Sequence, residues 1–215
     1  MYKTQRNLMI VSVFFIAALI TSNILAAKII QIGFVEIPAA VIAYPVTFLC
    51  IDIISELWGK KEAQFLVRVG LVVQVVTLIL IYIAIALPPA PYTNQEAFAA
   101  TLGTQWGIVL ASLLAYLASQ SFDVFAFHKI RERFKPKWAR NSTTIVSQLI
   151  DTTIFITLAG LLVWGIPLQT ILVMIACQYA VKVLFALADT PFFYFFTRHG
   201  QAASPEEYER MKAGK

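Results

Sequence analysis

Six apolar segments, each about as long as a bilayer is thick, dominate the sequence and limit what it can fold into. They are Leu8–Ala27, Ile37–Leu57, Phe65–Leu87, Ile108–Phe127, Ile145–Trp164 and Ile171–Ala188. A helix that spans a membrane needs roughly 20 mostly apolar residues. With 59% hydrophobic and only 13% charged residues, the chain is too apolar for a soluble domain. The sequence therefore predicts an all-α polytopic membrane protein: residues 1–199 form a single six-helix transmembrane domain and residues 200–215 a polar cytoplasmic tail.

The basic residues occur in alternate loops between these segments. All but two of the 17 Lys and Arg residues lie before Leu8, between 60 and 68, between 129 and 140, or after 197. By the positive-inside rule, both termini face the cytoplasm and the loop from Pro88 to Trp106 is external. The short basic loop 129–140 is tethered to the bilayer, which favours anionic lipid over nucleic acid as its partner. The two exceptions are Lys28 and Lys182.

The last two apolar segments carry polar residues on one helical face each. Thr144, Gln148, Asp151 and Phe155 recur at spacings of four, three and four residues, which places them on one face of a helix. The following segment repeats this pattern with Gln178, Lys182, Phe185 and Asp189. Only Gly165–Pro167 interrupts the apolar run between them, so we expect antiparallel neighbours that can turn these faces toward each other.

Asp151 and Lys182 are charged residues deep inside predicted transmembrane helices. Such a charge costs at least ~2.5 kcal/mol on insertion scales, so each residue needs a partner. At a rise of 1.5 Å per residue, Asp151 lies about 15 Å from the inner end of its helix and Lys182 about 16 Å from the outer end of the next. Both depths are close to the midplane. The pair is either a structural salt bridge or part of a substrate or ion pathway, and the pathway is the default for paired intramembrane charges.

Three further polar residues are candidates for function. Asn23 lies near the outer end of the first segment, where it either joins helices or contacts substrate. Asp52 and Glu56 are one helical turn apart at the inner end of the second segment. Two such carboxylates, partly removed from water, would share a proton and could couple transport to protons. Alternatively, Glu56 reaches the interface and is neutralised there by the neighbouring lysines.

The sequence does not favour an enzyme. His128 and His199 both fall at cytoplasmic helix ends, no Gly-x-Ser-x-Gly occurs, and no His, Cys and carboxylate cluster has metal-ligand spacing. A Walker motif is also missing, so the chain carries no nucleotide hydrolysis of its own. We expect no catalytic residue, no cofactor and no metal site.

Three stretches resemble the motifs of the queuosine precursor transporter family. They are Ser22–Lys28, Pro45–Asp52 with Glu56 and Gly59, and Arg140–Thr152. Lys182 and Thr190-Pro191 also fit. The resemblance implies a six-helix multi-pass protein of the bacterial inner membrane, similar to vitamin uptake transporters. It also implies import of 7-cyano-7-deazaguanine and 7-aminomethyl-7-deazaguanine, precursors of a modified tRNA base.

Side-chain chemistry, rather than the resemblance, selects the substrate contacts. A guanine-type edge presents two adjacent N–H donors beside one acceptor, which a carboxylate and a cation or amide can match. The expected substrate-binding residues are Asn23, Gln148, Asp151, Phe155, Gln178, Lys182 and Phe185. The alternative is a substrate-capture subunit that needs separate ATPase partners, as in energy-coupling-factor transporters. The sequence leaves a homo-oligomer open.

Overall fold

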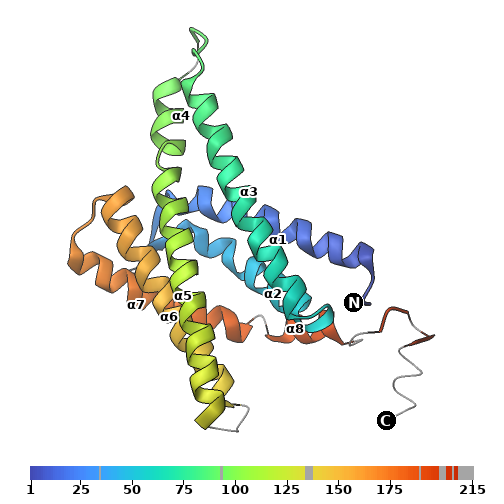
Figure 1. The fold of residues 1–215 in the computed structure, drawn as a ribbon. Helices are drawn as coiled ribbons and strands as arrows, with labels where there is room; N and C mark the ends of the chain where they lie inside the picture. The colour runs from blue at the N-terminus through green and yellow to red at the C-terminus, as the bar shows by residue number, and fades with distance from the viewer. Residues whose placement is uncertain are drawn as a thin grey trace. The chain divides into compact units, whose positions relative to one another are not determined.

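The computed structural model describes most of the 215-residue chain. Described are residues 1–33, 35–92, 94–133, 138–188, 190–198, 202–204 and 206–207, with side chains omitted at 120–121, 123–133, 138–145, 147, 186–187 and 190. Helices make up nearly all of the regular structure (Figure 1). They are α1 (Gln5–Ala26), α2 (Tyr44–Leu57), α3 (Lys60–Ala86), α4 (Gln95–Leu102), α5 (Gln105–Arg133), α6 (Trp138–Ala159), α7 (Leu168–Ala188) and α8 (Thr190–Thr197).

Four helical stretches of the described chain are long and apolar enough to cross a membrane. They are Gln5–Ala26, Lys60–Ala86, Gln95–Ser119 and Leu168–Phe185, and Gln148–Trp164 is a shorter apolar helix. On α3, large apolar side chains such as Val72, Ile79 and Leu80 are exposed on the protein surface. Lipid is the solvent that suits such a surface. The chain is therefore a helical polytopic membrane protein, while a count of six spans and the orientation of the termini stay predictions.

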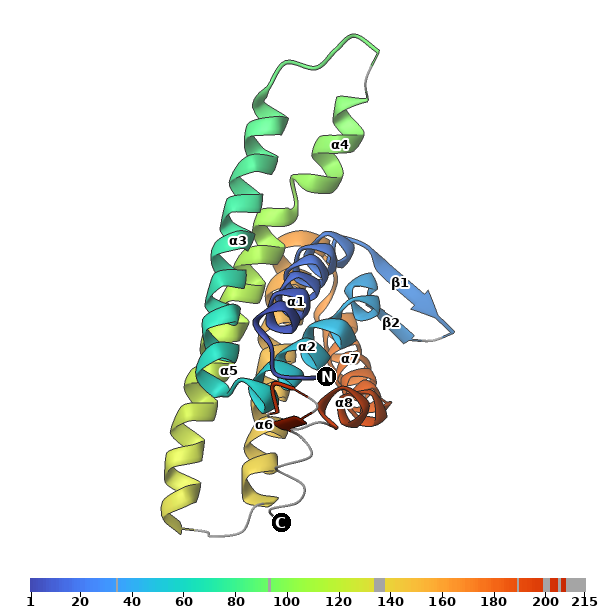
Figure 2. The same ribbon diagram turned by 90° about the vertical axis from the view of Figure 1, so that its right-hand side faces the viewer.

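The second predicted helix begins later than the apolar pattern indicates. The pattern predicts a helix from Ile37, but the chain first forms an antiparallel hairpin of β1 (Ile29–Ile32) and β2 (Val35–Pro38), seen in Figure 2. A 3₁₀ turn, η1 (Ala39–Ile42), follows. Pro45 lies in the first turn of α2. A proline needs no backbone N–H partner there, so it helps to start the helix.

The chain divides into two compact units. The first, unit 1, comprises Met1–Leu25, Ala39–Ile79 and Lys182–Lys215. Its apolar core is formed by α1, α2 and the start of α3, and includes Phe15, Ile54 and Leu57. Helices α2 and α8 also pack against each other. A Cβ atom added to Gly70 of α3 would lie only 2.7 Å from Leu19 Cδ2, so the glycine allows α1 and α3 to approach closely.

The second unit, unit 2, comprises Ala26–Pro38 and Leu80–Val181. Its centre is the long antiparallel pair of α5 and α6, which lie side by side in both views (Figures 1 and 2). After Ala159 the helix widens into a π-helical turn, η2 (Gly160–Trp164), which packs on α5 at Gly107. Gly165 then ends the helix with a φ of 60°, a left-handed conformation that glycine adopts without strain.

Candidate functional site

Lys182 lies in α7 beside two aromatic rings of α2, all within unit 1. Its Nζ atom is 5.7 Å from the centroid of the Tyr44 ring and 5.8 Å from that of Phe48. Both distances fall within the range of a cation–π interaction, which is about 6 Å. All three side chains are half-buried. The intramembrane cation that the sequence singles out is thus stabilised in part by aromatic faces.

The start of α2 holds these two rings in place. Tyr44 and Phe48 are four residues apart, so they lie on the same helical face, with ring centroids 6.2 Å apart and planes inclined by 23°. Between them, the buried Thr47 donates its hydroxyl to the Tyr44 carbonyl oxygen at 2.7 Å. Sequence reasoning missed both aromatic residues. The available signal was their four-residue spacing around Pro45 and Thr47, but their approach to Lys182 depends on tertiary structure.

Gln178 is one helical turn before Lys182 in α7. Its side chain is only 2% exposed, and its carbonyl oxygen Oε1 is buried without a hydrogen-bond partner among the described residues. An unsatisfied buried acceptor costs about 1–3 kcal/mol. Native structures keep few such groups, and a ligand is one of the reasons for doing so. This oxygen is a candidate acceptor for an N–H donor.

The residues of α6 differ in what surrounds them. Phe155 is buried and meets Trp164 edge-on, with ring centroids 6.3 Å apart and planes at 80°. Gln148 and Asp151 are half-buried, and the backbone oxygen of Gln148 accepts a bond from the buried Thr152 at 2.9 Å. The ring of Phe155 is therefore already packed by an aromatic neighbour. By contrast, Phe185 on α7 is 36% exposed.

The predicted partners Asp151 and Lys182 belong to different compact units, Asp151 to unit 2 and Lys182 to unit 1. Their pairing stays a prediction from sequence. Two further positions of the expected polar faces lie outside what is described, namely the side chain of Thr144 and the whole of Asp189.

Asn23 takes part in a buried contact between helices. Its amide donates to Oε1 of Gln74 on α3, and both side chains are at most 5% exposed. The amide of Gln74 in turn donates to the Leu19 carbonyl oxygen at 3.5 Å. Of the two interpretations of Asn23, this arrangement matches helix packing. A contact of Asn23 with substrate stays a prediction.

Asp52 and Glu56 are exposed on the protein surface of α2 and lie one turn apart. In the described part of the chain, no group of three or more His, Cys, Asp or Glu residues could hold a metal ion.

Several long apolar helices with buried amides and an intramembrane cation define the class of a polytopic membrane protein. Residues 38–196 match the family model described as "Putative vitamin uptake transporter". This match covers well over half of the chain, and the chain belongs to that vitamin uptake transporter family.

One curated relative has a more specific name than the family as a whole. The chain is 28% identical over 182 residues to a "Probable queuosine precursor transporter" of Bacillus subtilis (strain 168). The match covers 82% of this chain and 79% of the relative. No solved structure matches the chain significantly. The family expected from the three sequence stretches is confirmed, and with it a multi-pass membrane protein of a transporter family.

Proposed function

We propose that this protein imports the deazaguanine precursors of queuosine, 7-cyano-7-deazaguanine and 7-aminomethyl-7-deazaguanine, across the bacterial inner membrane. The relative in Bacillus subtilis supports the substrate class. The observation that carries the proposal is the buried Oε1 of Gln178, which has no hydrogen-bond partner among the described residues and lies one turn from Lys182 in sequence. The guanine-type edge of these bases has N–H donors, which need an acceptor, and a carbonyl oxygen, which needs a donor or a cation.

In this proposal each polar residue has a defined part. Asp151 and Gln178 Oε1 accept from N1–H and the exocyclic amine of the base, and Lys182 or the amide of Gln148 donates to O6. Adenine reverses this pattern, with an amine in place of O6 and no N1–H. A site built on hydrogen bonds rejects such an analogue strongly, by roughly 10⁴-fold in favourable cases. The remaining expected contacts are Asn23, Phe155 and Phe185.

The test of this function is restoration of queuosine in tRNA. A cell unable to make the precursor expresses the protein and is fed a low concentration of either base. Restoration is expected with the wild-type chain, inhibited weakly by excess guanine and not by adenine. Failure of the wild-type chain to restore queuosine would overturn the function. Unchanged restoration by Asp151→Asn, or equal competition by adenine, would overturn only the assignment of the site.

The proposed interaction of Asp151 with Lys182 has its own test. Removing one member leaves the other charge buried without its partner, which is worse than removing both. Uptake by Asp151→Asn, Lys182→Met and the double variant should therefore be strongly non-additive. Additive losses would show that the two residues act separately.

The proposed topology places both termini in the cytoplasm and residues 88–106 outside, with 1–199 as one transmembrane domain. A cysteine placed at Asn94, in a background lacking Cys50 and Cys177, should react with an impermeant reagent in intact cells. One placed at Lys135 should be protected. The reverse pattern would contradict the orientation.

The energy source separates this proposal from the alternative, a capture subunit of an energy-coupling-factor transporter. Purified protein in liposomes should take up the base without ATP or partner proteins. Binding without uptake would favour the capture subunit. We propose proton coupling through Asp52 and Glu56, so uptake should increase with external acidity. Uptake that ignores an imposed proton gradient would remove these two carboxylates from the mechanism.

A further inference from the structure

We propose that Tyr44 and Phe48, here called the ring pair, form an ammonium-binding surface at which a cationic substrate replaces Lys182. Lys182 then sets the preference of the transporter between cationic and neutral precursors. This inference rests on the proposed function, because it concerns how the same site distinguishes the two bases. Phe48 lies in the stretch Pro45–Asp52 and Tyr44 directly precedes it, but neither is among the substrate contacts expected from the sequence.

The geometry already shows an ammonium group at the ring pair. Nζ of Lys182 lies at nearly equal distances from the two centroids, 5.7 and 5.8 Å. The two rings are stacked on one face of α2, with their centroids 6.2 Å apart. The hydroxyl of Thr47 donates a hydrogen bond to the backbone carbonyl oxygen of Tyr44. Aromatic faces that attract one ammonium will attract another, since the interaction depends on charge and ring quadrupole rather than on the carrier of the charge.

The two precursors differ at the 7-position in the property that this surface detects. The cyano group is neutral, whereas a primary alkylamine such as the aminomethyl group is protonated at neutral pH. A second ammonium beside Lys182 would be repelled strongly in an environment of low dielectric constant. The cationic base can therefore occupy the ring pair only when Lys182 leaves it.

The neutral base does not require Lys182 to leave the ring pair. Lys182 can stay at the ring pair and donate a charge-assisted hydrogen bond to O6 of the bound base. Lys182 is thus a partner of the cyano precursor and a competitor of the aminomethyl precursor. In the wild-type protein this competition lowers the affinity for the cationic base relative to the neutral one.

Removing the competitor should shift that preference toward the cationic base. In Lys182→Gln, which keeps a donor for O6 but no charge, the affinity for 7-aminomethyl-7-deazaguanine relative to the 7-cyano base should rise by about tenfold, a size between those of an exposed and a fully desolvated cation–π contact. Adding Phe48→Leu in the same background should abolish most of this gain, because one ring of the surface is then missing.

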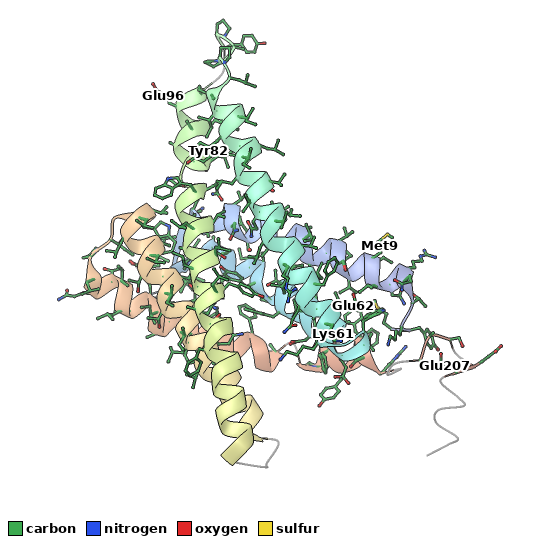
Figure 3. The ribbon with its side chains drawn as sticks, in the orientation of Figure 1. Met9, Lys61, Glu62, Tyr82, Glu96 and Glu207 are labelled. Carbon is green, nitrogen blue, oxygen red and sulfur yellow. The ribbon has the colours of Figure 1, made fainter. Side chains whose placement is uncertain are left out.

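The measurement is the dissociation constant of each base for the purified full-length protein in detergent, by calorimetry. Lys61→Gln is the matched control, since Lys61 is an exposed lysine at the start of α3 (Figure 3) and its loss removes the same charge. The ratio of the two constants should stay at the wild-type value in this control. A gain shared by Lys61→Gln would show an effect of net charge and would overturn the proposal.

Failure of the proposed function and failure of the exchange at the ring pair would give different results. If the wild-type protein binds neither base, the proposed function itself fails. If it binds the cyano base and the ratio is unchanged in Lys182→Gln, the function stands and the exchange at the ring pair is wrong. Should Lys182→Gln fail to fold, Phe48→Leu alone decides: it should weaken the cationic base more than the neutral one, and equal weakening of both overturns the proposal.

Discussion

The two compact units differ in the hydrogen bonding of their buried side-chain amides. In unit 1 the buried polar residues are Ser22, Asn23, Thr47 and Gln74, and each donates or accepts a side-chain hydrogen bond. In unit 2 the buried hydroxyls of Ser119 and Thr152 also donate to backbone oxygens, but each of the two buried amides has an unpaired atom, the oxygen of Gln178 and the nitrogen of Gln105. The indole nitrogen of Trp164 is buried and unpaired as well. These are the unpaired buried side-chain atoms found among the described residues.

We interpret the difference as one between polar groups that hold helices together and polar groups left open to a ligand. Polar residues that pair inside a membrane protein hold helices together, each contributing on the order of 0.6–2 kcal/mol. Those that stay unpaired reduce stability, and a ligand that completes their hydrogen bonds is one reason for keeping them. We therefore expect substitutions of buried amides to have opposite signs in the two units.

The largest effect is expected in unit 1. Asn23→Leu removes the donor that serves Gln74 Oε1 and leaves a buried amide oxygen without its partner. Such a loss costs about 1–3 kcal/mol, which should appear as a clear fall in thermal midpoint in detergent. The double variant Asn23→Leu/Gln74→Leu removes both amides and should recover much of it. A double variant as unstable as the sum of the single ones would show that the two amides do not depend on each other.

A second substitution tests whether unit 2 is merely loosely packed. A Cβ atom at Gly160 would lie 2.8 Å from Cδ1 and 2.9 Å from Cγ1 of the fully buried Ile171. Gly160→Ala should therefore lower stability by about 1–3 kcal/mol through overpacking. The companion Gly160→Ala/Ile171→Val makes room for the methyl group and should restore part of the loss. Full tolerance of Gly160→Ala would attribute the unpaired polar atoms to loose packing instead of ligand binding.

The sequence predicts α1, α3 and α7 well, but it misses α4 inside the expected loop 88–106 and places the beginning of α2 too early. Apolar length alone predicts α1, α3 and α7, because lipid imposes that length on any spanning helix. It also extends α2 back to Ile37, where β2 and η1 form instead. The strands Ile29–Ile32 and Val35–Pro38 are mostly apolar and rich in β-branched residues, with Gln31 and Glu36 as exceptions, so hydrophobicity alone does not distinguish a hairpin there from a helix end.

The site is predicted in part for similar reasons. Helical spacing finds Gln178 and Lys182, since their common face follows from the period of the helix. It does not find Tyr44 and Phe48, whose rings meet Lys182 from a segment more than 130 residues earlier in the chain. Nor can spacing reveal that Gln178 Oε1 is unpaired, because hydrogen-bond satisfaction is a property of the packed structure.

Gln178→Met should have the opposite sign to Asn23→Leu. Methionine approximates the shape of glutamine and removes the unpaired oxygen, so stability should rise by up to about 1 kcal/mol. Binding of the cyano base should weaken about tenfold, because one hydrogen bond of roughly 1.4 kcal/mol is lost. The thermal midpoint without ligand and the dissociation constant measure the two effects separately. A destabilised variant would show that the oxygen has a partner in the protein.

The smallest effect is expected at Trp164. Phenylalanine removes the unpaired indole N–H and keeps an aromatic edge against Phe155, a contact worth about 0.5–1.5 kcal/mol. The gain from losing a buried donor and the cost of a smaller ring nearly cancel, so Trp164→Phe should lie within about 0.5 kcal/mol of the wild type. Trp164→Leu, which loses the aromatic contact as well, should be less stable by about 1 kcal/mol more. If Trp164→Phe were instead as costly as Asn23→Leu, the indole nitrogen would have to be paired in the folded protein, and the contrast between the two units would rest on the glutamines alone.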